Sequence, residues 1–79
     1  MIEKLQKIIR EAKGDDKLSV TPEMVLISDL KLDSFDVAQL VNEIENEFGI
    51  RVNDRDINNF KTVKNILDYI EEKQKQKQQ

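Results

Sequence analysis

Residues 33–49, DSFDVAQLVNEIENEFG, contain the strongest helix signal in the chain. Apolar side chains recur there at steps of three and four, which places them along one stripe of a helix. The stripe consists of Val37, Leu40, Val41, Ile44 and Phe48. Asp33 precedes it as a candidate N-cap, and Gly49 follows it as a candidate C-terminal glycine. The segment therefore predicts a helix over about residues 34–48 that buries one face.

Similar stripes predict one further helix on each side of this segment. The first spans about residues 2–13 and ends at Gly14. Its apolar residues are Ile2, Leu5, Ile8, Ile9 and Ala12. The last spans about residues 63–72 behind Thr62, a good N-cap. Its apolar residues are Val63, Ile66, Leu67 and Ile70.

The connections between these helices are less regular. Residues 15–31 break the periodicity, and we expect a loop there with a short helical turn from Pro22 to Val25. Residues 54–60 are expected to form one or two helical turns. No segment has the alternation of a strand. The pattern therefore predicts an all-α fold, a small antiparallel bundle of three main helices plus one short helix.

The Lys/Gln alternation near the C-terminus contains nothing apolar to bury. We therefore expect one helical domain over residues 1–72 and a disordered Lys/Gln tail over residues 73–79.

Composition excludes several classes of protein. The chain has 79 residues and contains neither Cys nor His, so it lacks a disulfide framework, a thiol nucleophile and the commonest general base. A self-sufficient enzyme is not expected. Its apolar runs are too short for a membrane span, which needs roughly 20 residues. We expect a soluble, cytoplasmic monomer.

The formal charge of −3 is unevenly distributed. Residues 1–14 and 61–79 each have a net charge of +2, whereas residues 15–60 contain eleven acidic and four basic groups. An acidic centre would repel nucleic acid phosphates, so no nucleic acid partner is expected. It favours partners with basic surfaces.

Ser34 stands between Asp33 and Asp36 at the start of the central helix. The simplest interpretation is structural, because Ser and Asp at a helix start cap free backbone N–H groups. As a nucleophile Ser34 would have no His to activate it. A serine at a helix tip is also exposed and rigidly held, which suits a residue that another protein modifies.

The whole pattern resembles the acyl carrier proteins. The residues that carry the resemblance are residues 28–36, Gln39-Leu40-Val41, Ile44-Glu45, Glu47-Phe48, Ile50, Asp54, Thr62-Val63 and Asp68-Tyr69-Ile70. The resemblance implies that a phosphopantetheinyl transferase attaches 4'-phosphopantetheine from coenzyme A to Ser34. Acyl groups of fatty acid biosynthesis, or of related lipid metabolism, would then be carried as thioesters on the terminal thiol of this prosthetic group. The chain would be a phosphoprotein and a carrier rather than an enzyme.

The resemblance also implies a docking surface and an acyl pocket. Considered one at a time, each acidic residue is most simply interpreted as a solvated residue on a helix face. By resemblance, acyl-transferring, condensing or ligase enzymes would dock their basic patches on the helix after Ser34. The candidate recognition residues are Asp33, Phe35, Asp36, Glu43, Glu47, Asp54 and Asp56. The candidate pocket residues, which are core residues first, are Ala38, Leu40, Ile44, Phe48, Ile57 and Phe60.

The alternation of Asp54, Asp56 and Asn58 resembles the start of a calcium-binding EF-hand loop. Asn59 stands where the turn glycine belongs, and Asn65 stands where the closing Glu belongs. No specific metal site is expected.

Departures from the usual fatty-acid carrier keep other hypotheses open. The departures are Lys31, Phe35, Gln39, Asn42, Arg51 and Arg55. One alternative is a specialised carrier of an aminoacyl, aryl or polyketide unit in a dedicated pathway. An alternative of another class is an unmodified helical protein-interaction module in which Ser34 is only a cap.

Overall fold

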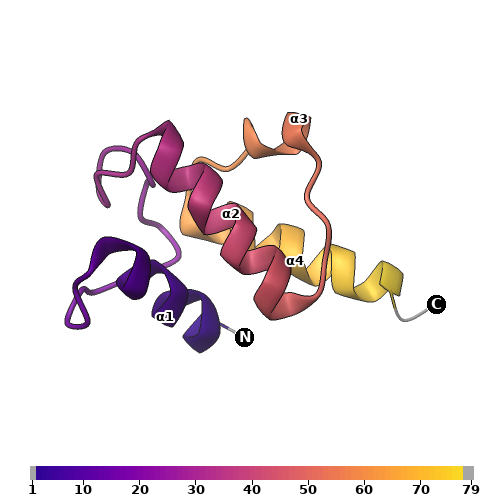
Figure 1. The fold of residues 1–79 in the computed structure, drawn as a ribbon, viewed down its shortest axis with the longest axis horizontal. Coiled ribbons are helices and arrows are strands. Elements are labelled where there is room, and N and C mark those ends of the chain that lie inside the picture. The colour runs from indigo at the N-terminus through magenta and orange to yellow at the C-terminus, as the bar shows by residue number, and fades with distance from the viewer. Residues whose placement is uncertain (1, 78–79) are drawn as a thin grey trace.

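Four helices make up the fold of the computed structural model, which describes residues 2–77 (Figure 1). They are α1 (Ile2–Lys13), α2 (Ser34–Phe48), α3 (Asp54–Ile57) and α4 (Val63–Lys77). No strand occurs over the described residues. The predicted all-α bundle of three main helices and one short helix is therefore confirmed.

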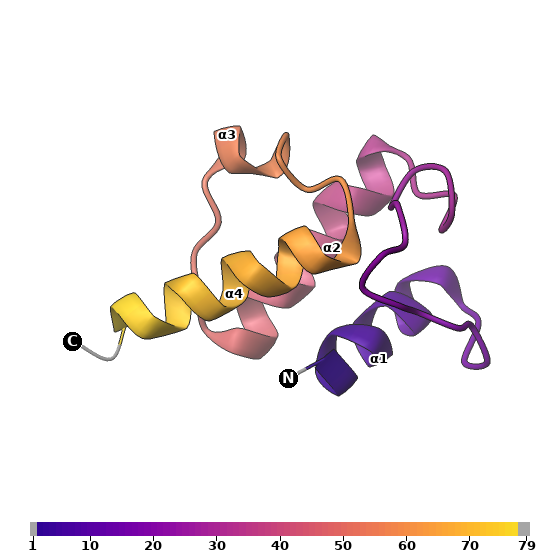
Figure 2. The ribbon, with the colours of Figure 1, turned by 180° about the vertical axis from the view of Figure 1, so that it is seen from behind.

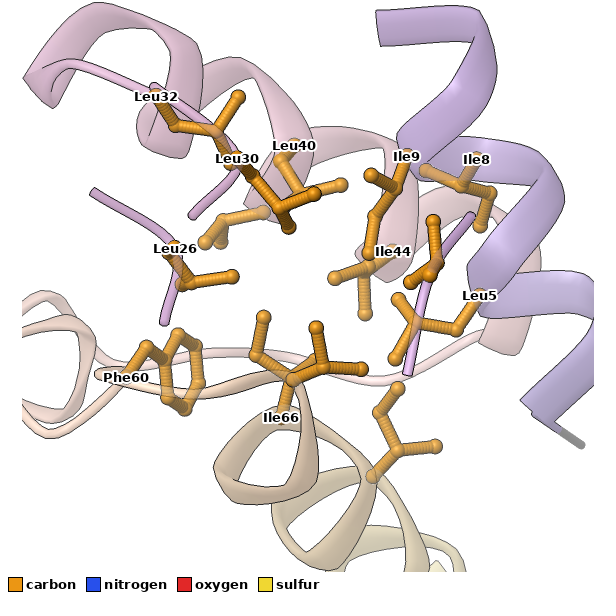
Figure 3. Packing of buried hydrophobic residues seen from close by; sticks show 14 of the residues in the cluster. Leu5, Ile8, Ile9, Leu26, Leu30, Leu32, Leu40, Ile44, Phe60 and Ile66 are labelled. Carbon is orange, nitrogen blue, oxygen red and sulfur yellow. The ribbon is translucent and has the colours of Figure 1, made fainter. Parts of the chain in front are cut away.

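A single apolar cluster holds the bundle together (Figure 3). Helices α1, α2 and α4 each contribute one apolar stripe, and the segment between α1 and α2 adds four residues. The largest fully buried side chains are Leu5, Ile9, Leu26, Leu30, Leu32, Leu40, Ile44, Ile66, Ile70 and Val63. No polar or charged residue in the described part of the chain is buried. Apolar burial is therefore the main force that assembles the three long helices.

Both ends of α2 have the caps that the sequence predicts. The Asp33 carboxylate accepts the Asp36 backbone N–H at 2.8 Å, and the Asp36 carboxylate accepts the Asp33 N–H at 3.2 Å. This is a capping box, which satisfies two otherwise free donors. Gly49 ends the helix with φ 64°, a left-handed conformation that glycine adopts without steric cost.

The segment between α1 and α2 differs from its prediction. In place of the expected helical turn from Pro22 to Val25, one hydrogen-bonded turn covers Pro22 and Glu23, closed by the Met24 N–H that donates to the Thr21 carbonyl at 3.2 Å. Val25 instead forms an isolated antiparallel bridge with Thr62, just before α4. A turn follows, in which the backbone N–H groups of residues 29 and 30 bond to the Val25 carbonyl.

The last helix is longer than predicted. The prediction that helix ends at residue 72 and a disordered tail begins at residue 73 is wrong for residues 73–77, which belong to α4. Lys73 and Gln74 are half-buried, and Lys73 Nζ lies 5.4 Å from the centre of the Tyr69 ring. These contacts extend the helix beyond its apolar stripe. Residues 78 and 79 lie outside the described part of the chain.

Helices α1 and α3 lie on opposite sides of the pair formed by α2 and α4, as both views show (Figures 1 and 2). Helix α1 packs along α2. The N-terminus of α2 and the segment after α3 are brought together on the α3 side, where they line a common pocket. No helix among the described residues is long and apolar enough to cross a membrane.

Candidate functional site

Ser34 is the first residue of α2 and is exposed. Asp33 and Asp36 form the capping box across it, so their carboxylates stabilise the helix start instead of bonding to the serine. The Asp33 side chain satisfies only one of the N–H groups of the first turn, and the positive end of the helix favours a phosphate nearby. An exposed hydroxyl at this position therefore suits a residue that receives a phosphate ester.

A pocket of about 370 Å³ opens beside Ser34. The serine itself is one of the lining residues. The lining residues are Val25, Ile27, Ser34, Val37, Ile57, Asn58, Phe60 and Lys61. The walls are thus mainly apolar and come from three parts of the chain: the segment before α2, the start of α2, and α3 with the residues that follow it.

Two of the six candidate residues for an acyl pocket line this cavity. Ile57 and Phe60 line the pocket, whereas Leu40 and Ile44 are 0% and 1% exposed and lie in the core. Ala38 is exposed on α2 and Phe48 is half-buried near its far end, and neither lines the pocket. Leu40, Val41 and Ile44 of the α2 stripe are buried in the core cluster, and Val37 is the residue of that stripe that lines the pocket.

Three apolar lining residues were not recognised as such from the sequence. Val37 belongs to the helical stripe, so its apolar periodicity was a usable signal. Val25 and Ile27 lie in a segment without periodicity, which is brought to the pocket by the bridge from Val25 to Thr62 and by backbone hydrogen bonds such as that from the Leu26 N–H to the Lys61 carbonyl. No local pattern could have indicated that long-range pairing.

Two large apolar side chains near Ser34 face the solvent. Phe35 is 72% exposed, and Ile27, which shares the pocket with Ser34, is 70% exposed. Most large apolar side chains of this chain are buried, so this pair is an exception. Ser34 therefore has exposed apolar side chains close to it.

The predicted acidic recognition residues fall into separate groups. Glu43 and Glu47 border a groove against α1, where Glu47 lies 3.8 Å from Lys4 Nζ. Asp33 and Asp36 form the capping box, and Asp36 is half-buried. The structure therefore gives several of these carboxylates partners within the chain.

Asp54 and Asp56, the remaining acidic candidates, both belong to α3. Asp54 is exposed, whereas Asp56 accepts a hydrogen bond of 2.8 Å from the Tyr69 hydroxyl of α4. No three His, Cys, Asp or Glu side chains of residues 2–77 gather closely enough to hold a metal ion.

Tyr69 is the centre of a group of contacts that we call the Tyr69 cluster: Asn53, Asp56, Phe60, Tyr69 and Lys73. Besides the Asp56 bond, the Tyr69 Oη accepts the Asn53 N–H at 3.5 Å, and its ring meets Phe60 edge-on at 5.1 Å. Burial raises the pKa of Tyr69, and the hydrogen bond to Asp56 raises it further, because both disfavour the phenolate. The cluster joins α3 to α4 and so holds one wall of the pocket.

Comparisons with known proteins agree with this geometry. The model of the phosphopantetheine attachment site family matches residues 3–70. An acyl carrier protein of Thermotoga maritima is 46% identical over 70 residues, which cover 89% of this chain and 86% of that protein. A crystal structure of an acyl carrier protein from the same organism superposes with a TM-score of 0.83 at 33% identity, covering 95% of this chain and 87% of that one. The chain therefore belongs to the acyl carrier proteins, non-catalytic carriers whose prosthetic group is 4'-phosphopantetheine.

Proposed function

We propose that Ser34 is the residue that carries 4'-phosphopantetheine. The single observation that best supports this is its position, because Ser34 is exposed at the first turn of α2 and lines the mainly apolar pocket. The arm, when attached, supplies the thiol that this chain lacks, and acyl groups are carried on it as thioesters. The chain itself holds the serine in place through the capping box of Asp33 and Asp36.

The pocket gives an attached acyl chain a place out of water. Val25, Val37, Ile57 and Phe60 offer aliphatic and aromatic surface next to the attachment point. Burying apolar surface there is favourable by roughly 25 cal/mol per Å². A carrier needs this shelter to be reversible, and a wall built on the short helix α3 suits that need, since α3 itself buries no residue.

Partner enzymes approach Ser34 across the start of α2. Phe35 and Ile27 offer them apolar contact, while Glu43 and Glu47 offer negative charge farther along the helix. We propose that a phosphopantetheinyl transferase and acyl-transferring, condensing or ligase enzymes bind here, in the cytoplasm, to a monomeric carrier. Such contacts form fast and dissociate readily, as successive transfer between enzymes requires.

We propose that the acyl groups are intermediates of fatty acid biosynthesis. A specialised carrier in a dedicated pathway is the second candidate, because Gln39 and Asn42 place uncharged side chains on the exposed face of α2. Mass spectrometry of the thioester on protein purified from its own host distinguishes the two. Fatty acyl chains support the first proposal, and an aminoacyl or aryl thioester would overturn it.

The attachment itself is tested by incubating the chain with coenzyme A and a broad-specificity phosphopantetheinyl transferase. We expect one arm to be added, at Ser34, in the wild type and in Ser28→Ala, which removes another exposed serine six residues away. Ser34→Ala should gain none. Absence of any added mass on the wild type would favour the unmodified interaction module instead.

A further inference from the structure

Lys61 is the only charged residue among those that line the Ser34 pocket. The other polar lining residues are Ser34 and Asn58, and the remaining five are apolar. The pocket therefore combines a mainly apolar wall with one residue that carries a positive charge, beside the attachment point. A purely aliphatic ligand makes no use of that charge.

The backbone around Lys61 is held on both sides. Its N–H lies 3.1 Å from Asn65 Oδ1, and its carbonyl accepts the Leu26 N–H at 2.9 Å. The side chain is exposed, and no carboxylate in the described part of the chain lies within ion-pair distance of its ammonium group. Lys61 is thus a well-placed residue whose charge is not used to hold the fold.

The charges around Ser34 explain why a cation is useful there. Asp33 and Asp36 flank the serine, and Asp29 lies five residues before it and accepts the Val25 N–H at 2.7 Å. An anion attached to Ser34 is therefore placed among carboxylates, which repel it. A lysine that shares the pocket offsets part of that repulsion.

We propose that Lys61 provides the positive partner for an anionic group carried on Ser34. This anion is either the phosphodiester of the arm or a carboxylate at the far end of the acyl cargo. The inference rests on the proposed attachment at Ser34 and adds a chemical preference to it: the apolar wall takes the neutral chain and Lys61 takes the charge. Lys61 is then a specificity-determining residue of the pocket.

The test compares Lys61→Met with Lys64→Met, which removes another exposed lysine, three residues farther on in the first turn of α4 and not in the pocket. Lys61→Gln serves as a second neutral variant, and Lys61→Arg retains the charge. Each protein is loaded by the transferase, once with coenzyme A and once with glutaryl-coenzyme A labelled with ¹³C at its free carboxyl carbon. Mass spectrometry first verifies the loading, and amide NMR spectra verify the fold.

Two NMR readouts then distinguish the sources of the anion. If the phosphodiester is the partner, its ³¹P resonance in the free-thiol form moves in Lys61→Met and Lys61→Gln but not in Lys61→Arg or Lys64→Met. If the cargo carboxylate is the partner, its pKa rises by about 0.2 to 0.7 units in the two neutral Lys61 variants, as expected for an exposed ion pair that is lost. Lys64→Met should match the wild type in both readouts.

The inference is overturned if the loaded Lys61 variants and Lys64→Met give the same ³¹P resonance and the same carboxyl pKa as the wild type. That outcome leaves the attachment at Ser34 intact. Failure of the wild type to accept the arm is a different result, because it removes the proposed function and, with it, the anion for which Lys61 is the partner.

Discussion

Helices α1 and α3 flank the same central pair of helices, but they are attached to it by different forces. Helix α1 buries Leu5, Ile8 and Ile9, and Lys4 on its surface forms an ion pair with Glu47 of α2. Helix α3 buries none of its four residues. Ile57 of α3 packs against the core while only partly buried, and the Tyr69 cluster adds hydrogen bonds and one aromatic contact in place of an aliphatic stripe.

Because of this difference, the stability of the fold and the shape of the pocket depend on different contacts. Apolar burial costs several kcal/mol to undo, whereas a hydrogen bond that water can replace contributes only about 0.5 to 1.5 kcal/mol. The pocket beside Ser34 takes Ile57 and Asn58 from the weakly attached side, next to Phe60, which belongs to the core cluster. We infer that this wall opens locally while the three long helices remain packed.

The largest effect is expected from the α1 side. Ile9 is 0% exposed, so Ile9→Ala leaves a cavity in the core and should lower the free energy of unfolding by about 2 to 5 kcal/mol. Urea denaturation followed by circular dichroism measures this loss. Lys7→Ala, on the exposed face of the same helix, should change stability by less than about 0.5 kcal/mol. Equal losses in the two variants would contradict the attachment of α1 by burial.

A smaller, local effect is expected on the α3 side. Tyr69→Phe retains the ring contact with Phe60 but removes the hydroxyl that bonds to Asp56, at a cost of about 0.5 to 1.5 kcal/mol. Amide hydrogen exchange should therefore become faster in α3, while the amides of α1 keep the protection of the wild type. Asp56→Asn retains an acceptor oxygen and is the milder control. Faster exchange over the whole chain in Tyr69→Phe would show that α3 does not open independently.

A pH titration examines the same contact. Burial and Asp56 raise the pKa of Tyr69 above its ordinary value of 10.0. The folded chain therefore retains a proton that the unfolded chain releases, so this contribution to stability is complete below pH 10 and is lost as the pH rises through the folded pKa. Tyr69 is the only tyrosine, so its ultraviolet absorbance reports this titration directly. The titration midpoint of Tyr69 in the folded chain should lie above the midpoint in the urea-unfolded chain. Equal midpoints would contradict the burial of Tyr69 and its hydrogen bond to Asp56.

The helices could be predicted from the sequence because their signals are local. The spacing from Val37 to Phe48, with Asp33 before it and Gly49 after it, defined α2 with its observed bounds. The same capping logic placed Ser34 at an exposed helix start. Residues three or four apart meet on one helix face whatever the rest of the chain does, so short-range spacing was sufficient.

The pocket could not be predicted in the same way, because its walls depend on contacts between distant residues. Val25 reaches Ser34 through its bridge with Thr62, and α3 is placed by the bond from Asp56 to Tyr69, thirteen positions later. Neither pairing follows from a regular spacing in the sequence, so the residues that line this pocket could not be read from periodicity alone.

The smallest effect is expected from the ion pair that joins α1 to α2. Lys4 and Glu47 are 64% and 50% exposed, so water and salt screen their attraction. Lys4→Gln should therefore lower the free energy of unfolding by no more than about 1 kcal/mol, and by less in high salt than in low salt. Denaturation of the wild type and of Lys4→Gln at two salt concentrations measures this difference. A loss as large as that of Ile9→Ala would mean that charge, and not the aliphatic stripe, attaches α1, and the contrast with α3 would then disappear.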